Sequence, residues 1–133
     1  MKTIHVVAAA IFHKSRVLAT QRGYGDFKDS WEFPGGKIEP HETPEMALAR
    51  EIREELDLDI QVGDSIGRVH CDYPDFHLDM EVFACRIKDG KMVLKEHEGA
   101  LWASDAMLDD LAFLPADLEV LPSIKKFLLD SSL

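Results

Sequence analysis

The sequence has no long apolar run, since none of its hydrophobic stretches approaches the ~18 residues that a membrane-spanning helix needs. Cysteine is also scarce: Cys71 and Cys85 are isolated and lack the spacing of metal ligands. We expect both to be small buried hydrophobic residues in a reducing cytoplasm. The apolar stretch from Met1 to Phe12 has no cleavage pattern behind it, which favours a buried first strand over a signal peptide.

Positive charge is in deficit, with 15 Lys and Arg residues against 25 Asp and Glu residues and a net charge of −10. This balance argues against a nucleic-acid polymer as partner, because such partners need a basic surface. It does not argue against a small-molecule nucleotide, since metal ions and a few local cations can hold a triphosphate. The six His residues lack metal-ligand spacing, and only His77 is expected near a site.

Length and composition predict a single globular domain over residues 1–133, with no repeat, low-complexity segment or linker. The expected class is α/β (α+β), a mixed sheet sandwiched between helices. In the first half we predict strands at 3–11 and 16–22, a turn at 13–15, a loop at 23–30, an extended piece at 31–33, a turn at 34–36 and a helix at 44–56. In the second half we predict strands at 60–73 (broken near Gly63) and 76–87, a hairpin turn at 89–90, strands at 92–94 and 100–102, and a helix within 118–129, bent or restarted at Pro122.

The predicted helix at 44–56 is amphipathic. Thr43 is a typical N-cap, and Pro44 is well tolerated at the first helical position because its missing N–H has no partner there. Leu48, Ile52 and Leu56 recur every four residues and predict an apolar stripe that faces a core.

A second stripe on this helix is acidic. Glu51, Glu54 and Glu55 are three or four residues apart or adjacent, so their carboxylates converge. Three anions so close together repel one another and disfavour the helix, and a divalent cation such as Mg²⁺ removes that penalty. The alternative is an ordinary solvated acidic face.

The spacing of these residues extends to a longer motif. Gly36 is followed by Glu42, then by Arg50-Glu51-Ile52, Glu54-Glu55 and Leu58. This stretch, residues 36–58, resembles the Nudix box, G-x5-E-x7-R-E-U-x-E-E-x-G-U, in which U is a bulky aliphatic residue. Eight of the nine defined positions match, and Asp57 replaces the late Gly. Asp tolerates the left-handed conformation expected there, so the fold should survive the replacement.

The resemblance to MutT-type Nudix enzymes covers nearly the whole chain. The segments that carry it are Gln21-Arg22, Glu32–Glu39, Tyr73-Pro74-Asp75, Glu96 six residues before Trp102, and Leu114–Asp117. It implies a single Nudix hydrolase domain that hydrolyses a nucleoside triphosphate to the monophosphate and pyrophosphate, with Mg²⁺ or Mn²⁺ as cofactor. It further implies a cytoplasmic enzyme that sanitises the nucleotide pool and has no membrane partner.

The resemblance also implies roles for individual residues. Metal ligands would be Glu51, Glu54, Glu55, the Gly36 carbonyl and Glu96; Glu98 competes with Glu96, which the spacing to Trp102 favours. Glu51 and Glu96 are both candidates for the general base. Arg22 and Lys37 would contact phosphates, and a pairing of Glu42 with Arg50 would orient the helix and the preceding loop.

Recognition of the base is less defined by the sequence. Asp117 is either a helix N-cap or an acceptor for a base edge, which suits 8-oxo-dGTP or (d)CTP-type substrates. Phe33 and Phe76 could stack on the base or belong to the core. Two alternatives remain open: a Nudix enzyme for another nucleoside diphosphate derivative such as ADP-ribose, and a non-catalytic nucleotide-binding module. The chain could be a monomer or a homodimer.

Overall fold

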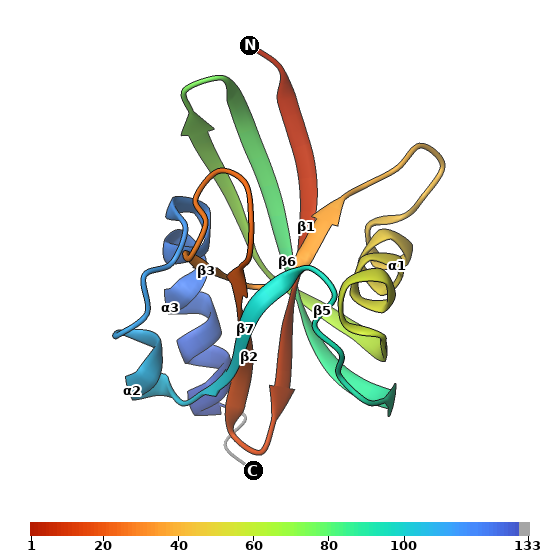
Figure 1. Ribbon diagram of the computed structural model, residues 1–133, viewed down its shortest axis with the longest axis vertical. Helices are drawn as coiled ribbons and strands as arrows, with labels where there is room; N and C mark the ends of the chain where they lie inside the picture. Colours follow the sequence, from red (N-terminus) through yellow and green to blue (C-terminus); the bar gives the residue numbers. More distant parts are fainter. Residues whose placement is uncertain (131–133) are drawn as a thin grey trace.

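The sheet is organised around two parallel strands at its centre, β1 (Thr3–His13) and β6 (Phe76–Gly90). The computed structural model describes residues 1–130. Its strands follow the order β3-β2-β1-β6-β5, with β4 paired to β1 and β7 paired to β2 (Figure 1). The other elements are β2 (Arg16–Arg22), β3 (Trp31–Glu32), β4 (Gly35–Lys37), α1 (Pro44–Leu56), β5 (Leu58–Tyr73), β7 (His97–Ala103), α2 (Asp105–Leu108) and α3 (Pro115–Asp130).

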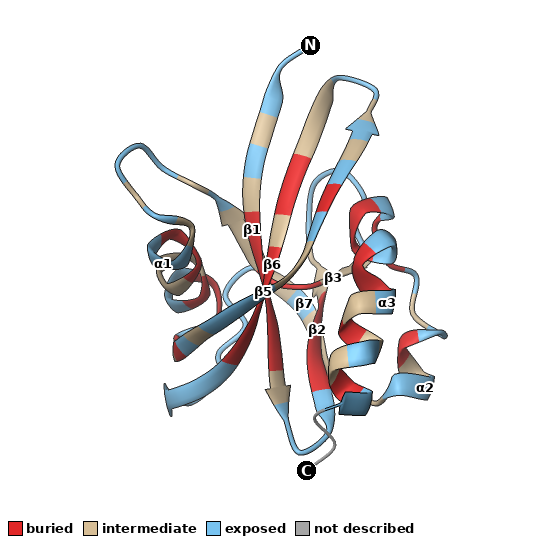
Figure 2. Ribbon diagram, turned by 180° about the vertical axis from the view of Figure 1, so that it is seen from behind, coloured by how far each residue is buried: buried red, intermediate tan, exposed pale blue. Residues whose placement is uncertain are grey.

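Helices cover both faces of the sheet, α1 on one side and α2 with α3 on the other (Figure 1). Side chains of β1 alternate between the two cores, as expected for a strand buried on both faces. Val7, Ala9 and Ile11 pack with α1, and Ala8 and Ala10 pack with α3. Buried residues therefore run through the middle of the molecule, between exposed outer helix surfaces (Figure 2). The predicted mixed sheet between helices is confirmed.

Helix α1 begins and ends as its sequence predicts. Thr43 accepts a hydrogen bond from Met46 N at 3.1 Å, and Pro44 opens the helix. Asp57 closes it in the left-handed conformation, with φ 59° and ψ 31°, and donates its N–H to the Arg53 carbonyl. The predicted apolar stripe is fully buried.

Two predictions about short segments are wrong. Residues 34–36 do not form a free turn, because Gly35–Lys37 is strand β4, antiparallel to β1. A Cβ on Gly35 would lie 1.9 Å from the Val7 carbonyl oxygen, so only glycine allows this pairing.

The strand predicted at 92–94 is also absent. Strand β6 continues through Gly90, so residues 89–90 are not a hairpin turn. The segment that follows satisfies the last carbonyls of α1: Val93 N donates to Leu56 O at 2.9 Å and Lys95 N to Glu55 O at 3.2 Å.

Helix α3 starts before the predicted range and is continuous through Pro122, so the predicted restart is wrong. Asp117 lies inside its first turn, which rules out the N-cap interpretation. The short helix α2, capped by Ser104, was not predicted. No helix within residues 1–130 is long and apolar enough to cross a membrane.

The two cysteines are free thiols and differ in burial. Cys85 is buried as expected, and burial raises its pKa to about 12, whereas Cys71 is only partly buried.

Candidate active site

The site begins where strand β4 touches helix α1. A Cβ on Gly36 would lie 2.4 Å from the carboxylate carbon of Glu51, so the backbone of β4 approaches this side chain as closely as glycine permits. Glu51 is three helical positions after Leu48, on the edge of α1 that faces the strand. The first and the middle parts of the motif thus meet in space.

Arg50 holds this region together through several hydrogen bonds. Its Nε and one Nη donate to Glu42 at 2.7 and 3.0 Å, and the Lys37 carbonyl accepts from the same Nη at 3.1 Å. The other Nη donates to Glu51 at 2.9 Å and to Glu54 at 3.2 Å. The predicted pairing of Glu42 with Arg50 is confirmed, and it joins the loop before α1 to the acidic stripe.

The three motif carboxylates have different environments. The Glu54 side chain is 59% exposed and that of Glu51 is 17% exposed, while Glu55 is buried. Burial, followed by the charge of Glu51, raises the pKa of Glu55 to about 9. Burial also raises the pKa of Glu51. Oε2 of Glu55 is buried without a hydrogen-bond partner within residues 1–130.

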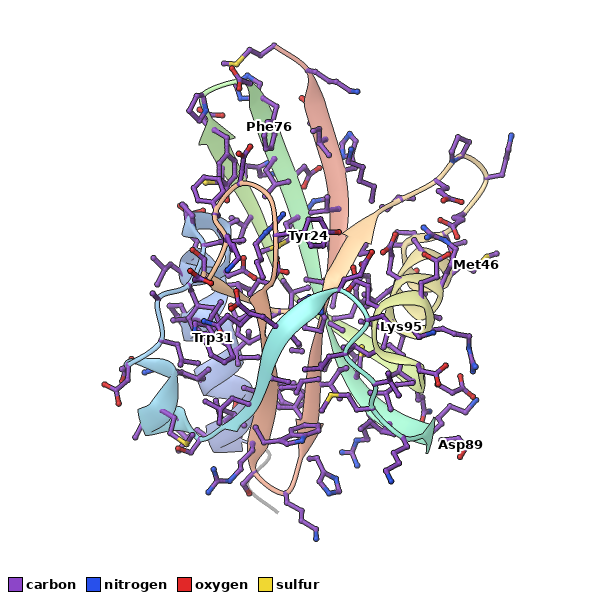
Figure 3. All side chains as sticks on the ribbon, viewed as in Figure 1. Tyr24, Trp31, Met46, Phe76, Asp89 and Lys95 are labelled. Atoms are coloured by element: carbon purple, nitrogen blue, oxygen red, sulfur yellow. The ribbon has the colours of Figure 1, made fainter. Side chains whose placement is uncertain are left out.

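The segment before β7 brings a fourth carboxylate to this place. Lys95 lies beside α1 (Figure 3) and its N–H binds the Glu55 carbonyl, so Glu96 follows directly at the site. Glu96 and Glu55 line a cavity of about 270 Å³ together with Arg22, Gly36 and Lys37. Glu98 points elsewhere, with its carboxylate 3.5 Å from Lys28. Glu96 therefore lines this cavity and Glu98 does not, in line with the preference for Glu96 that its spacing to Trp102 indicates.

A second cavity of about 390 Å³ adjoins the first and shares Arg22, Glu32, Gly36 and Lys37 with it. Asp117 lies in its wall, 4% exposed, and its Oδ1 accepts a hydrogen bond from Phe33 N at 3.0 Å. Burial raises the pKa of Asp117 to about 7.

The neighbouring backbone explains how α3 delivers Asp117 to this cavity. Trp31 N donates to Ala112 O at 2.9 Å, and Leu114 N donates to Trp31 O at 3.0 Å. The chain before α3 is thereby fixed beside β3, and the first turn of the helix faces Phe33.

Aromatic side chains form much of the second cavity. Phe33 is buried and stacks on Phe113, with ring centroids 5.1 Å apart, so it belongs to the core and lines the cavity as well. Phe76 stacks on Tyr73 at 5.0 Å, and Phe27 meets Tyr73 edge-on at 5.9 Å. Neither Phe27, an exposed residue of the loop at 23–30, nor Tyr73, at the end of β5, was assigned to the site from the sequence.

His97 lies at the site, whereas the sequence analysis expected His77 there. His77 pairs with Asp72 and lines neither cavity, whereas His97 lines the smaller one. Glu32, which lies next to His97, lines both cavities. The sequence analysis named it only within the segment Glu32–Glu39 and gave it no role. His97 could have been found from its position next to Glu96.

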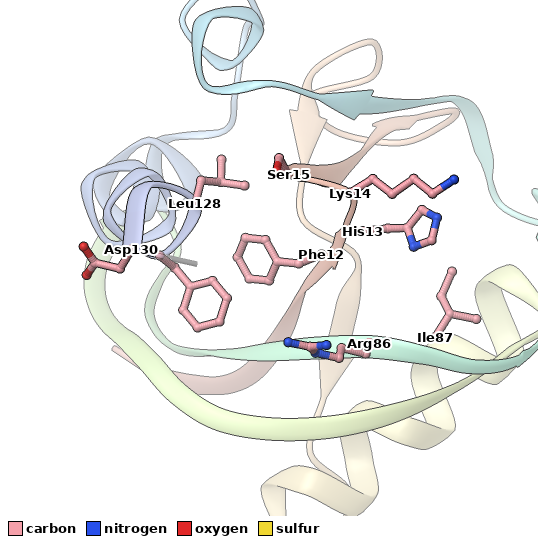
Figure 4. Close-up of a pocket in the computed structure, with 9 residues that line it drawn as sticks. Phe12, His13, Lys14, Ser15, Arg86, Ile87, Leu128 and Asp130 are labelled. Carbon is pink, nitrogen blue, oxygen red and sulfur yellow. The ribbon is translucent and has the colours of Figure 1, made fainter. Parts of the chain in front are cut away.

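A larger cavity, about 460 Å³, lies at the other end of β1, between the β1–β2 turn and the end of α3 (Figure 4). None of the predicted site residues lines it. Chemistry, rather than volume, therefore identifies the site.

A metal ion fits the donor set at Gly36 and α1. Within residues 1–130, no three acidic, His or Cys side chains are arranged to hold an ion as they stand, and Arg50 donates hydrogen bonds to Glu51 and Glu54. The unpartnered Glu55 Oε2, the close approach of Gly36 and the excess of carboxylates nevertheless favour a hard divalent cation, which prefers oxygen ligands.

Solved structures share this overall fold. The solution structure of the E. coli ORF135 protein has a TM-score of 0.83 and 31% identity, and covers 96% of this chain and 91% of its own. The crystal structure of a MutT protein from Methanosarcina mazei Go1 has a TM-score of 0.81 and 25% identity, covering 99% and 97%.

Sequence comparisons agree with the structural ones. The NUDIX domain model matches residues 1–126. The CTP pyrophosphohydrolase of Escherichia coli (strain K12) is 35% identical over an alignment of 134 positions, gaps included. The alignment covers 91% of this chain and 90% of the relative. The 8-oxo-dGTP diphosphatase of Proteus vulgaris is 37% identical over 101 residues, covering 74% and 88%. The chain belongs to the Nudix family, as its motif predicts.

Proposed function

We propose that this protein is a metal-dependent nucleoside triphosphate pyrophosphohydrolase that converts a (d)NTP or an oxidised (d)NTP and water to the monophosphate and pyrophosphate. The observation that carries the proposal is the continuity of the two cavities. One end holds Glu55 and Glu96, the other holds buried Asp117 among aromatic side chains, and Arg22 and Lys37 line both cavities. This order of groups matches metal, phosphates and base along one nucleotide.

The metal would be held by Glu51, Glu54, Glu55 and the Gly36 carbonyl, with Glu96 from the β6–β7 segment. Mg²⁺, or Mn²⁺ in its place, would supply charge neutralisation at the phosphoryl oxygens and a bound water of lowered pKa. Glu51 or Glu96 would take the proton of the attacking water, since each combines a carboxylate with a place beside the metal. Arg50 and Glu42 would keep Glu51 in position.

Phosphate binding falls to Arg22 and Lys37. The Lys37 side chain has no ion-pair partner within residues 1–130, and it lines both cavities. A free ammonium at the junction of the cavities can neutralise a phosphate without first breaking another contact.

Asp117 would read the base. One oxygen already accepts from Phe33 N, which leaves Oδ2 for the base edge. Because the Asp117 pKa is about 7, both forms of the carboxyl exist near neutral pH. The ionised form accepts from the cytosine amine, whereas the protonated form can also donate, as an oxidised guanine requires. This supports 8-oxo-dGTP and (d)CTP-type compounds as the leading substrates, the two classes named among the relatives.

The same proposal gives the protein a cytoplasmic role in sanitising the nucleotide pool, with a small-molecule nucleotide as its partner. The net charge of −10 supports the expectation that it does not bind nucleic-acid polymers.

A substrate panel with Mg²⁺ tests the proposal. The panel contains 8-oxo-dGTP, dCTP, the other (d)NTPs and ADP-ribose, and pyrophosphate release is scored against phosphate release. We expect pyrophosphate from the triphosphates and a preference for the first two. A preference for ADP-ribose, or binding of nucleotides without cleavage, would contradict the proposal.

A further inference from the structure

Glu32 occupies the junction of the two cavities and lines both of them. The buried hydroxyl of Thr20 donates to the Glu32 carbonyl at 3.3 Å and so holds its backbone against β2. Both carboxylate oxygens are engaged: Oε1 accepts from Arg22 at 3.2 Å, and Oε2 lies 3.3 Å from Nε2 of His97. Glu32 is also one of the charges that raise the pKa of Glu55 and of Asp117, so it is near both ends of the site.

His97 contacts Glu32 across β2, because β7 and β3 pair with the two edges of that strand. It lies on β7, where it pairs with Arg22 of β2, while Glu32 lies on β3 at the other edge of β2. Its side chain is 5% exposed, and its Nδ1 is buried without a partner within residues 1–130. Nε2 is therefore the nitrogen that donates, since the Glu32 carboxylate beside it is an acceptor. The bond ties β3 to β7 across the strand that carries Arg22.

The backbone of Glu96, the residue before His97, is restrained at three points. Lys95 N donates to the Glu55 carbonyl at 3.2 Å on one side. Gly23 lies against it on another, since a Cβ on Gly23 would be 2.9 Å from the Glu96 carbonyl oxygen. The His97 side chain provides the third restraint. The Glu96 carboxylate has no hydrogen-bond or ion-pair partner within residues 1–130, so its direction depends on this backbone.

We propose that Glu32 is a positioning residue of the reaction: one carboxylate oxygen holds Arg22 toward the phosphates, and the other, through His97, holds the backbone that carries Glu96. The inference rests on the proposed function, in which Arg22 binds phosphate and Glu96 helps to hold the metal. It links the phosphate-binding and the metal-binding parts of the site through one side chain.

The two links predict different kinetic effects. Loss of the His97 link displaces Glu96, which weakens metal binding and lowers kcat while leaving KM for the nucleotide at saturating metal nearly unchanged. Loss of Glu32 itself also releases Arg22, and therefore raises KM as well.

Two variants of His97 separate the hydrogen bond from packing. His97→Phe keeps a flat ring of similar size but has no donor, whereas His97→Gln places an amide donor at a similar reach. We expect His97→Phe to bind Mn²⁺ about 10-fold more weakly and to lose about 10-fold in kcat at a fixed subsaturating metal concentration, the usual effect of a lost hydrogen bond to a charged group. His97→Gln should stay close to the parent protein.

Glu32→Gln tests the other link, and Glu119→Gln is its matched control. Both remove one negative charge, but Glu119 is exposed on α3 and lines neither cavity. Glu32→Gln should raise KM and weaken Mn²⁺ binding together, each by several-fold, whereas Glu119→Gln should change neither. Circular dichroism and thermal unfolding show which variants are folded.

Mn²⁺ affinity is measured from the signal of free Mn²⁺ in electron paramagnetic resonance, which requires no turnover. Equal Mn²⁺ affinities of His97→Phe and His97→Gln would overturn the positioning role, and so would an unchanged KM and Mn²⁺ affinity in Glu32→Gln. A parent protein that binds Mn²⁺ but cleaves no triphosphate would refute the proposed function, while the two His97 variants would still decide the role of the bond. A parent protein that binds no Mn²⁺ would overturn the positioning of Glu96 as well.

Discussion

At the scale of single residues, the site contains carboxyl groups that are buried, where their ionised form is disfavoured. Within residues 1–130, one oxygen of the buried Glu55 has no hydrogen-bond partner, and the buried Asp117 accepts a hydrogen bond from Phe33 N. A buried carboxylate lowers the stability of the ligand-free protein. Binding of a cation or a base edge to it offsets this cost, so the carboxylate favours binding. The same residues should therefore control function and oppose stability, which yields three predictions.

Glu55→Gln should remove most metal-dependent hydrolysis and stabilise the metal-free protein by roughly 1–3 kcal/mol at pH 7, because the folded state no longer suppresses the ionisation of a buried acid. Glu54→Gln is the control: it should also lose hydrolysis, yet leave stability nearly unchanged, since its side chain is 59% exposed. Urea unfolding without metal and steady-state kinetics at saturating Mg²⁺ measure both effects. Near-normal rates in Glu55→Gln would rule out the assigned site.

Asp117→Asn should change how stability depends on pH. In the parent protein the unfolded Asp117 ionises near pH 4 and the folded one near pH 7, so the unfolded state binds fewer protons between these values. Stability from this group is therefore lost as the pH rises from about 4 to 7, by up to about 4 kcal/mol. Asn keeps an oxygen for Phe33 N and does not titrate.

Urea midpoints at pH 5 and pH 8 check this expectation. The difference in stability between Asp117→Asn and the parent should be larger at pH 8. Asp110→Asn, an exposed change, should show no such trend. A constant difference across the range would mean that Asp117 is not held protonated by the fold.

Asp117→Ala should reduce discrimination between bases by roughly 10- to 100-fold, the effect of one or two buried hydrogen bonds. Hydrolysis of the poorer substrates should change little, because Asp117 does not line the smaller cavity, where the metal and the phosphates are proposed to bind. Ratios of kcat/KM over the substrate panel measure the effect. An equal fall for all triphosphates would show that Asp117 supports the structure and does not read the base.

At the scale of elements, function depends on the contact between β4 and α1. The glycine strand lets the backbone of residue 36 reach the Glu51 carboxylate, and Arg50 binds the Lys37 carbonyl from the helix side. The two elements are brought together by buried packing of α1 against β1 and β5. This part of the site is therefore formed by packing, although its residues all lie within the motif at 36–58.

Gly36→Ala should abolish most activity while the protein remains folded. The added Cβ would lie 2.4 Å from the Glu51 carboxylate, which must swing away, and a flexible side chain can do so without unfolding the helix. Gly67→Ala is a matched control, since its Cβ would meet Val120 of α3 at 2.9 Å, and neither residue lines either cavity. We expect loss of at least about 100-fold in kcat for the first variant only. Equal loss in both would point to general destabilisation.

At the scale of the whole molecule, the acidic excess couples metal binding to stability. Part of the net charge of −10 is concentrated at the motif carboxylates, where the proposed cation would offset both their mutual repulsion and the cost of burying Glu55 as a carboxylate. Any ligand that binds only the folded state stabilises it in proportion to its occupancy.

Mg²⁺ at about ten times its dissociation constant should stabilise the parent protein by about 1.4 kcal/mol. The increment should disappear in Glu55→Gln and remain in Glu119→Gln. Thermal unfolding at matched ionic strength, with Na⁺ in place of Mg²⁺, gives the comparison. A gain of the same size in Glu55→Gln would place the binding of the ion elsewhere on the acidic surface.

The sequence by itself determined whatever depends on local geometry. Helical periodicity fixed the apolar and acidic faces of α1, Thr43 and Pro44 fixed its start, and Asp57 its left-handed end. Pairing of Glu42 with Arg50 also followed from the motif. These features need only the periodicity of a helix and the chemistry of its ends, and the motif spacing was sufficient to predict the family.

Only the tertiary structure decided which distant residues join the site. The place of Asp117 beside Phe33 and the bond between His97 and Glu32 depend on strand pairing and on hydrogen bonds between segments far apart in sequence. The strand predicted at 92–94 is absent for the same reason, because backbone N–H groups of this segment donate to the last carbonyls of α1. Local patterns do not contain such long-range pairings, since they arise only when the buried faces of separate elements pack together.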